Sequence, residues 1–229
     1  MARIGVIVGL AAEAEILEAF PADRRPVVAV AGASAARAEA AALKLIAQGC
    51  DALLSFGVAG GIDPALSPGT VIVADAVVLP DGTRIACDAD WHGRVLQRLS
   101  GKVPCFSGAI AGSNEPLLSP EAKAALSLRA RAVAVDMESH GVARAARAKG
   151  IPVLAVRAVA DGAERAIPAW VMDAILPDGG LAPGKIARAL LPRPWMVWSL
   201  LGLARDNGRA MGALGRVAAI LGPGGCFAG

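Results

Sequence analysis

Short apolar runs alternate along the chain with alanine-rich stretches that have helical spacing. Most of the runs are apolar at successive positions, which is typical of strands in a parallel sheet covered on both faces. The expected strands are 4–8, 27–31, 52–56, 71–78, 103–111, 132–135 and 153–159. Strands that alternate with helices in this way predict an α/β fold with three layers, in which helices flank a mostly parallel sheet.

Cap and stop residues divide the alanine-rich stretches into helices. Ser34 is placed to cap a helix that ends at Gly49, and the pair Ser119-Pro120 is placed to begin another. A third predicted helix, 138–149, ends in basic residues directly before Gly150.

The composition changes after Pro192, where a single long helix is predicted over 195–221. An apolar stripe follows one side, and arginines lie on the other. The stripe residues are Met196, Leu200, Leu203, Met211, Leu214, Ala218 and Leu221, and the arginines are Arg205, Arg209 and Arg216. We therefore divide the chain into a catalytic domain, 1–191, and an extension, 192–229, which is this amphipathic helix followed by a loose glycine-rich tail.

Three interpretations of this helix stay open at the level of sequence. Its stripe docks on the α/β body or on a second subunit; or Trp195, Trp198 and the arginines make a peripheral contact with a membrane surface; or the stripe covers a very apolar ligand. If the stripe only covers a ligand, removal of the chain after Pro192 abolishes turnover of a substrate with a lipid tail and spares small ones.

Composition narrows the function classes. Of 229 residues, 55% are hydrophobic and 19% charged, which excludes a disordered chain and a charged coiled coil. The net charge of +3 is too small to indicate a nucleic-acid partner. Four scattered cysteines and two histidines do not make a metal site or a disulfide scaffold, so we expect reduced thiols in the cytoplasm. A chain this apolar is also expected to form a homo-oligomer.

Candidate chemistry gathers where apolar strands end, because α/β sheets place their sites at the carboxyl ends of strands. Glu13 follows the first strand, although an acid here also suits a helix N-terminus. Glycines over 57–61 follow the third strand and form either a tight turn or a nest of backbone N–H groups for an oxygen-rich ligand. This segment lacks the Lys and Ser/Thr of a P-loop.

The last two strands end in acidic residues. Asp136 and Glu138 follow one, and Asp161 follows the other, which also carries Arg157. Acids beside a core normally pair or react. Asp136 is interpreted as a helix cap and Arg157 as the partner that orients Glu138 or Asp161, whereas Glu138 and Asp161 are better candidates for ligand contacts. His140 is interpreted as a satisfied core residue.

Three ordered segments resemble the purine nucleoside phosphorylase and methylthioadenosine nucleosidase superfamily over about residues 3–165. They are GLAAEAEIL, SFGVAGGIDPALSPGTVIVAD and AVDMESHGVARAARAKGIPVLAVRAVAD. More narrowly, VDMESH and the terminal PRPWMVWSLLGLARDNGRAMGAL resemble the hopanoid-associated branch, which is thought to remove adenine from adenosylhopane. The resemblance implies a three-layer fold with a mixed, mostly parallel sheet and cleavage of an N-glycosidic bond.

The resemblance also implies roles for individual residues. Asp161 matches the acid that protonates the departing purine, and an aspartate there suits adenine. Glu138 matches the carboxylate that binds the ribose 2′ and 3′ hydroxyls, and Met137 the residue beneath the ribose. Glu13 matches the carboxylate that activates water in the hydrolytic members.

The chain departs from the family at the nucleophile. Ser55 stands where phosphorolytic members have an arginine, and Val58 where hydrolytic members have a serine. The backbone N–H groups of Gly57, Ala59, Gly60 and Gly61 remain as a cradle for phosphate, so water and inorganic phosphate both stay open as co-substrates. The resemblance implies no cofactor. The competing functions are a methylthioadenosine or adenosylhomocysteine nucleosidase, and a non-catalytic nucleoside-binding module at a membrane.

Overall fold

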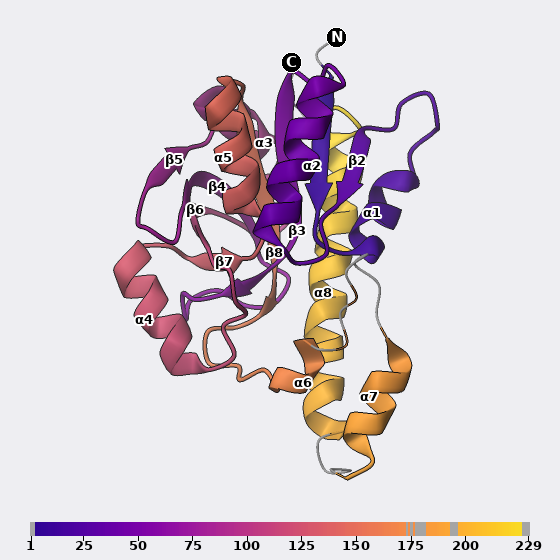
Figure 1. Cartoon of the computed structure of the whole chain (residues 1–229), viewed down its shortest axis with the longest axis vertical. Coiled ribbons are helices and arrows are strands. Elements are labelled where there is room, and N and C mark those ends of the chain that lie inside the picture. Colours follow the sequence, from indigo (N-terminus) through magenta and orange to yellow (C-terminus); the bar gives the residue numbers. More distant parts are fainter. Residues whose placement is uncertain (1–2, 173, 175, 177–181, 193–196, 226–229) are drawn as a thin grey trace.

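A central sheet organises the molecule, and a computed structural model describes it for residues 3–172, 174, 176, 182–192 and 197–225 (Figure 1). Its strands are β1 (Ile4–Val8), β2 (Val27–Val30), β3 (Ala52–Gly61), β4 (Val71–Val78), β5 (Arg84–Ala86), β6 (Cys105–Gly112), β7 (Ala134–Asp136) and β8 (Val153–Asp161). Both faces of β1, β3, β4 and β8 are almost completely buried, as their unbroken apolar sequences predict.

The sheet is mixed, mostly parallel, and closed on itself in the middle. Strand β3 pairs with β8, β8 with β4, β4 with β6, β6 with β7, and β7 again with β3. Strands β1 and β2 extend the sheet from β3, and β5 extends it from β4. The β3–β7, β4–β5 and β4–β8 pairs are antiparallel. The long strand β3 makes closure possible, because its last residues turn from β1 to β7.

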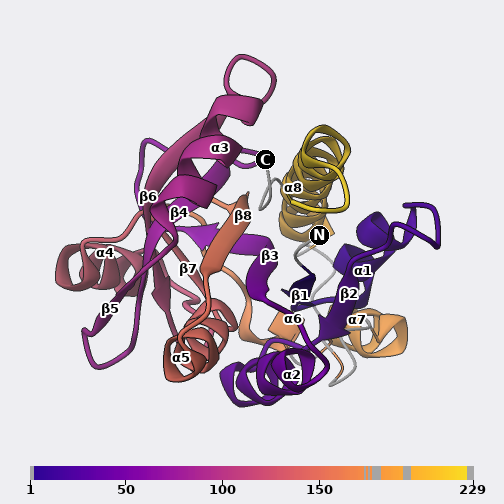
Figure 2. The ribbon, with the colours of Figure 1, turned by 90° about the horizontal axis from the view of Figure 1, so that it is seen from above.

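Helices cover both faces and complete the predicted three layers (Figure 2). Helices α1 (Ala11–Glu18), α3 (Ala89–Leu99) and α8 (Val197–Leu221) lie on one face, and α2 (Ala35–Ala47) and α5 (Ser139–Lys149) lie on the other. Helix α4 (Pro120–Ala130) packs beside β6, and the short helices α6 (Ala169–Met172) and α7 (Pro183–Leu190) lie at the lower end in Figure 1.

The predicted cap residues begin their helices. The side chains of Ser34 and Ser119 accept the backbone N–H groups of Arg37 and Ala122, and Gly150 ends α5 in a left-handed conformation. Strand β5 and helix α3 were not predicted. Strand β5 has only three residues, too few for a periodic pattern, and α3 carries just three buried apolar side chains among polar ones.

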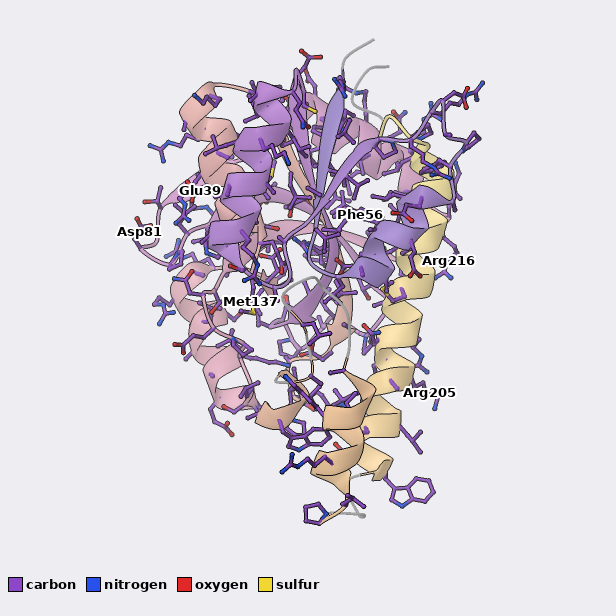
Figure 3. The ribbon with its side chains drawn as sticks, turned by 45° about the vertical axis from the view of Figure 1, so that its right-hand side comes forward. Glu39, Phe56, Asp81, Met137, Arg205 and Arg216 are labelled. Carbon is purple, nitrogen blue, oxygen red and sulfur yellow. The ribbon has the colours of Figure 1, made fainter. Side chains whose placement is uncertain are left out.

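The long C-terminal helix packs into the main core over its second half. Ala210, Ala213, Leu214 and Val217 are completely buried together with residues of the sheet. Arg205 and Arg216 point away from the body (Figure 3). Docking on the α/β body is therefore confirmed for this half. Because the helix supplies core side chains, removal of the chain after Pro192 would not test ligand contacts alone, and that expectation is corrected.

The end of the described chain is packed, in contrast to the predicted loose tail. Gly225 is buried, and its carbonyl accepts the indole N–H of Trp91 at 2.6 Å. Residues 226–229 lie outside the described residues, as do Trp195 and Met196. Cys50, Cys87 and Cys105 are free thiols. Among the described residues no helix is both long and apolar enough to span a membrane.

Candidate active site

A cavity of about 490 Å³ lies where β1, β3, β7 and β8 end, the place that strand direction predicts. Its size falls within the roughly 300–1,000 Å³ of ordinary small-molecule sites. Polar and charged side chains form one part of its wall, and aliphatic side chains form the rest. The charged lining residues are Glu13, Glu115, Lys123, Asp136, Glu138 and Asp161.

Glu13, in the first turn of α1, is held by backbone N–H groups. One carboxylate oxygen accepts those of Gly9 and Leu10 at 2.8 and 2.9 Å, and the other accepts that of Val58 at 2.7 Å. Burial raises the pKa of Glu13 above its ordinary value, although the Arg157 guanidinium and the three N–H donors oppose the rise. Glu13 is thus fixed at the cavity wall with a pKa moved toward neutrality, which suits a general base.

Arg157 lies behind the wall and joins two buried acids. Its guanidinium is 2.7 Å from Asp136 and 3.3 Å from Glu138, and it donates to the Ser55 hydroxyl at 2.6 Å. Arg157 is fully buried and does not line the cavity. It therefore orients carboxylates instead of touching a ligand. Asp136 caps α5 as predicted, because its carboxylate accepts the backbone N–H of Ser139.

Glu138 connects this buried cluster to the cavity. Burial raises its pKa to about 8, Arg157 opposes that rise, and the nearby Asp136 and Glu13 add to it. Burial thus favours the protonated form of Glu138, and the ion pair with Arg157 favours the ionised form. Gly9 lies directly against Glu138, because a Cβ at Gly9 would lie 2.8 Å from its carboxylate. Only glycine leaves room for Glu138 at this position.

Asp161, the last residue of β8, pairs with Lys123 and not with Arg157. A register shift between Ala59 and Gly60 places a bulge before Asp161, and a bulge re-aims the side chain that follows it. Lys123 of α4 ion-pairs with Asp161 and also donates to the carbonyls of Gly162 and Arg165 at 2.8 and 3.0 Å. Burial raises the pKa of Asp161, and Lys123 opposes the rise.

The glycine-rich segment forms the second half of β3, which excludes the tight turn, one of the two alternatives that the sequence left open. Gly57 and Ala59 pair with β8, and Gly60 and Gly61 pair with β7, so the sheet extends along both sides of this segment. Ala59 and Gly60 line the cavity, whereas Gly57 and Gly61 do not. Gly57 has a different use, because a Cβ there would lie 2.6 Å from both carboxylate oxygens of Glu13.

Most of the aliphatic part of the wall comes from the C-terminal third of the chain. Helix α8 contributes Leu200, Leu203 and Ala204, and α7 contributes Ile186. Leu117, Ile167, Val171 and Ala174 complete this part. The stripe on the long helix therefore does two things: its first turns line the cavity, and its later turns fill the core.

The structure gathers Glu13, Met137, Glu138 and Asp161 around one cavity, and Met137 lies near the middle of the molecule in Figure 3. His140 lies apart from it: its ring is fully buried and bonds to the Asn114 side chain at 3.0 Å. Lys123 was missed because a lone lysine in a helix carries no sequence signal. Among the described residues, no group of three or more His, Cys, Asp or Glu is arranged to hold a metal ion.

Comparison with known proteins places this fold and site in a family. Residues 16–191 match the model of the phosphorylase superfamily. A search of curated protein sequences gave no match.

Several solved structures share the fold at low sequence identity. The 5′-methylthioadenosine/S-adenosylhomocysteine nucleosidase of Neisseria meningitidis is 17% identical with a TM-score of 0.72, over 98% of this chain and 100% of that chain. The corresponding nucleosidase of Campylobacter jejuni is 20% identical with a TM-score of 0.66, over 76% and 91%. The futalosine hydrolase of Helicobacter pylori is 20% identical with a TM-score of 0.63, over 70% and 88%. Because the family model matches most of the chain and the fold agrees, this protein is an enzyme that belongs to the phosphorylase superfamily.

Proposed function

We propose that this enzyme cleaves the N-glycosidic bond of an adenosine modified at its 5′ carbon and releases adenine. The observation that carries the proposal is the convergence of Glu13, Glu138 and Asp161 on one cavity. Cleavage of this bond needs a proton for the leaving base, a hold on the sugar and an activated nucleophile. Three buried carboxyl groups with raised pKa values are suited to these three tasks.

Asp161 is the proposed acid for the base. In its protonated form it donates a proton to the imidazole-side nitrogen of adenine as the bond from that base to C1′ breaks, so adenine leaves neutral. Burial favours the protonated form, because a charged carboxylate is poorly solvated there. The reaction is therefore expected to be fast below the pKa of Asp161 and to slow as pH rises through it.

Glu138 is the proposed ligand of the ribose, with Met137 packed beneath the sugar ring. Two ribose hydroxyls that donate to the Glu138 carboxylate favour its ionised form and lower its pKa. Since the pKa in the empty site is about 8, binding at neutral pH is expected to release a proton. A ligand without these hydroxyls leaves the polar group unpaired and binds more weakly.

Water is the nucleophile that the charges favour. Lys123 is the one cation among the described lining residues, and it is already paired with Asp161. Five acidic residues line the same cavity, and none of its described lining residues is a cation free to pair with a phosphate dianion. Glu13 instead accepts a proton from water while the hydroxyl oxygen bonds to C1′. The arginine that Ser55 replaces is then not needed, because no phosphate is bound.

The 5′ substituent is proposed to be large and apolar, as in adenosylhopane. Support comes from the aliphatic wall that α7 and α8 add beside the acidic residues. Such a wall gains free energy from apolar surface at about 25 cal/mol per Å² and gives nothing to a polar tail. A methylthioadenosine or adenosylhomocysteine nucleosidase would act on shorter groups.

The first experiment measures adenine release from a 5′-alkylthioadenosine with and without inorganic phosphate. We expect the same rate in both and free 5-alkylthioribose as the sugar product. Asp161→Asn should lower kcat by about 10²–10⁴-fold, the usual contribution of a general acid. Asp75→Asn serves as control, because Asp75 is half exposed and pairs with Arg84 outside the cavity. A ribose 1-phosphate product would show that the nucleophile is phosphate.

The second experiment compares kcat/KM across a series of 5′ substituents of rising length. An apolar substrate class predicts that kcat/KM rises with chain length until the aliphatic wall is covered. A maximum at the methylthio group would assign the enzyme to the short-substituent nucleosidases.

A further inference from the structure

The lower end of the molecule carries an apolar surface that the active site does not use. Helix α7 and the first turns of α8 extend past the α/β body there (Figure 1). Leu191 is 82% exposed, Trp198 is 78% exposed and Leu201 is 55% exposed. Three large apolar side chains so close together in the chain are costly to leave in water, and groups of this kind normally mark a contact surface.

The first turns of α8 have two faces with different partners. Trp198, Leu201 and Arg205 are three and four residues apart and therefore lie on one side of the helix, which is exposed. Leu200, Leu203 and Asn207 have the same spacing on the other side and line the cavity. The apolar side chains on the exposed side are therefore not the ones that this part of the helix packs against the protein, because the opposite side lines the cavity.

Charge indicates what this surface contacts. The stretch 182–205 contains Lys185, Arg188, Arg193 and Arg205 and no acidic residue. Arg188 and Arg205 are exposed, and they lie three residues before Leu191 and four residues after Leu201 in the chain. A second copy of the chain that presented the same face would bring cations against cations, which disfavours a symmetric dimer through it. Aromatic and aliphatic side chains flanked only by cations fit the anionic headgroups and upper acyl region of a lipid surface.

We propose that Leu191, Trp198 and Leu201, with Arg188 and Arg205, form a docking face for an anionic lipid surface. The apolar side chains enter the headgroup boundary, and the two arginines bind lipid phosphates. The face covers only the start of α8. Arg209 pairs with Asp206, and Arg216 lies further along the helix beside the core-filling turns.

The docking face and part of the active-site cavity are formed by the same two helices. The same turns of α7 and α8 line the aliphatic part of the cavity from within. Provided the proposed function holds, an apolar 5′ group that lies in a bilayer would reach the aliphatic wall of the cavity at the place where the protein contacts the lipid surface. Lipid binding, however, is measured without any substrate, so the two proposals fail separately.

The test is co-sedimentation of the full chain with vesicles of phosphatidylcholine alone or mixed with phosphatidylglycerol. We expect binding to the anionic vesicles, weaker binding to the neutral ones, and a loss of binding at high salt. Arg188→Gln with Arg205→Gln should lower the partition coefficient about fivefold for each cation removed. Trp198→Ala with Leu201→Ala should lower binding to both kinds of vesicle.

Matched controls separate the docking face from other exposed residues. Leu128→Ala removes an 83% exposed leucine of α4, and Arg216→Gln removes an exposed arginine of α8; both should bind vesicles as the natural chain does. Thermal melting followed by circular dichroism should be unchanged in both double variants, which shows that they fold whether or not the proposed activity holds. Equal sedimentation of the double variants and the natural chain would overturn the proposal. So would an absence of sedimentation with anionic vesicles, or a natural oligomer that dissociates in the Trp198/Leu201 variant without any vesicle binding.

Discussion

At the scale of single residues, two cations pair with different buried acids. Arg157 lies behind the wall with Asp136 and Glu138, whereas Lys123 reaches the cavity and pairs with Asp161. A buried acid with a cation beside it has a pKa set by two opposed effects, because burial favours the proton and the cation favours its loss. Lys123 also donates to two carbonyls of the loop after β8, so it fixes both the charge and the place of Asp161.

Lys123→Met is expected to change the pH dependence of the enzyme. Loss of the ammonium removes the group that stabilises the Asp161 carboxylate, so the pKa of Asp161 rises further. If protonated Asp161 is the active form, the alkaline limb of kcat/KM moves to higher pH while kcat falls, since the carboxyl group is less well positioned. The measurement is a pH–rate profile.

Two variants keep that result interpretable. Lys123→Arg should restore the natural position of the alkaline limb, because the charge is kept. Lys44→Met, an exposed lysine of α2, should leave the profile unchanged. An alkaline limb that stays in place in Lys123→Met would show that Lys123 does not act through Asp161.

At the scale of elements, the contact between α2 and α5 positions Glu138. Helix α5 begins directly after Glu138 and packs on α2 at Gly141, where a Cβ would lie 2.2 Å from the carbonyl oxygen of Ala35. Backbone cannot move away as a flexible side chain can. The glycine therefore sets how close the two helices lie, and with it the position of Glu138, the proposed ligand of the ribose.

Gly141→Ala is expected to lower the free energy of unfolding by about 1–3 kcal/mol, the usual cost of overpacking. Gly208→Ala is the matched control on α8, where nothing lies within 4 Å of the added Cβ. That change should raise stability by up to about 1 kcal/mol, because alanine is the better helix former. Urea unfolding followed by circular dichroism measures both. Equal effects of the two substitutions would show that the α2–α5 contact is not tight.

At the scale of the whole molecule, one core includes the sheet and the long C-terminal helix. Leu214 and Val217 are completely buried with residues of β3, β4 and β8. The same helix supplies Leu200 and Leu203 to the cavity. Stability and substrate choice therefore depend on different turns of one element.

Deletion of residues 193–229 is expected to abolish turnover of short and long substrates alike, because it removes core side chains. Leu200→Ala with Leu203→Ala leaves the core intact and should lower kcat/KM only for long apolar 5′ groups. Thermal melting shows whether each variant is folded, and the ratio of kcat/KM for a long and a short substrate measures the effect. A deletion variant that melts cooperatively and still uses short substrates would contradict this assignment of the helix to the core.

Local pattern determined the layers, most strands and the position of the acids in the chain. Unbroken apolar runs mark strands buried on both faces, and Ser34, Ser119 and Gly150 mark helix ends, because these effects act between near neighbours. Glu138 and Asp161 were singled out for the same reason, because each follows an apolar strand closely. Glu13 gained its role only from the family resemblance, since an acid there also suits a helix N-terminus.

Tertiary structure decided which strands pair and which cation each buried acid contacts. The pairing of β3 with β7 and β8 makes the glycine-rich segment a strand and not a tight turn, one of the two forms that the sequence left open. The bulge before Asp161 places that acid beside Lys123 and not beside Arg157. Both depend on contacts between segments far apart in the chain, for which the pattern of nearby residues holds no information. Helix α8 has parts that line the cavity, that are exposed and that fill the core, and tertiary contacts decide this division too. An apolar stripe in the sequence does not show which of these surroundings it meets.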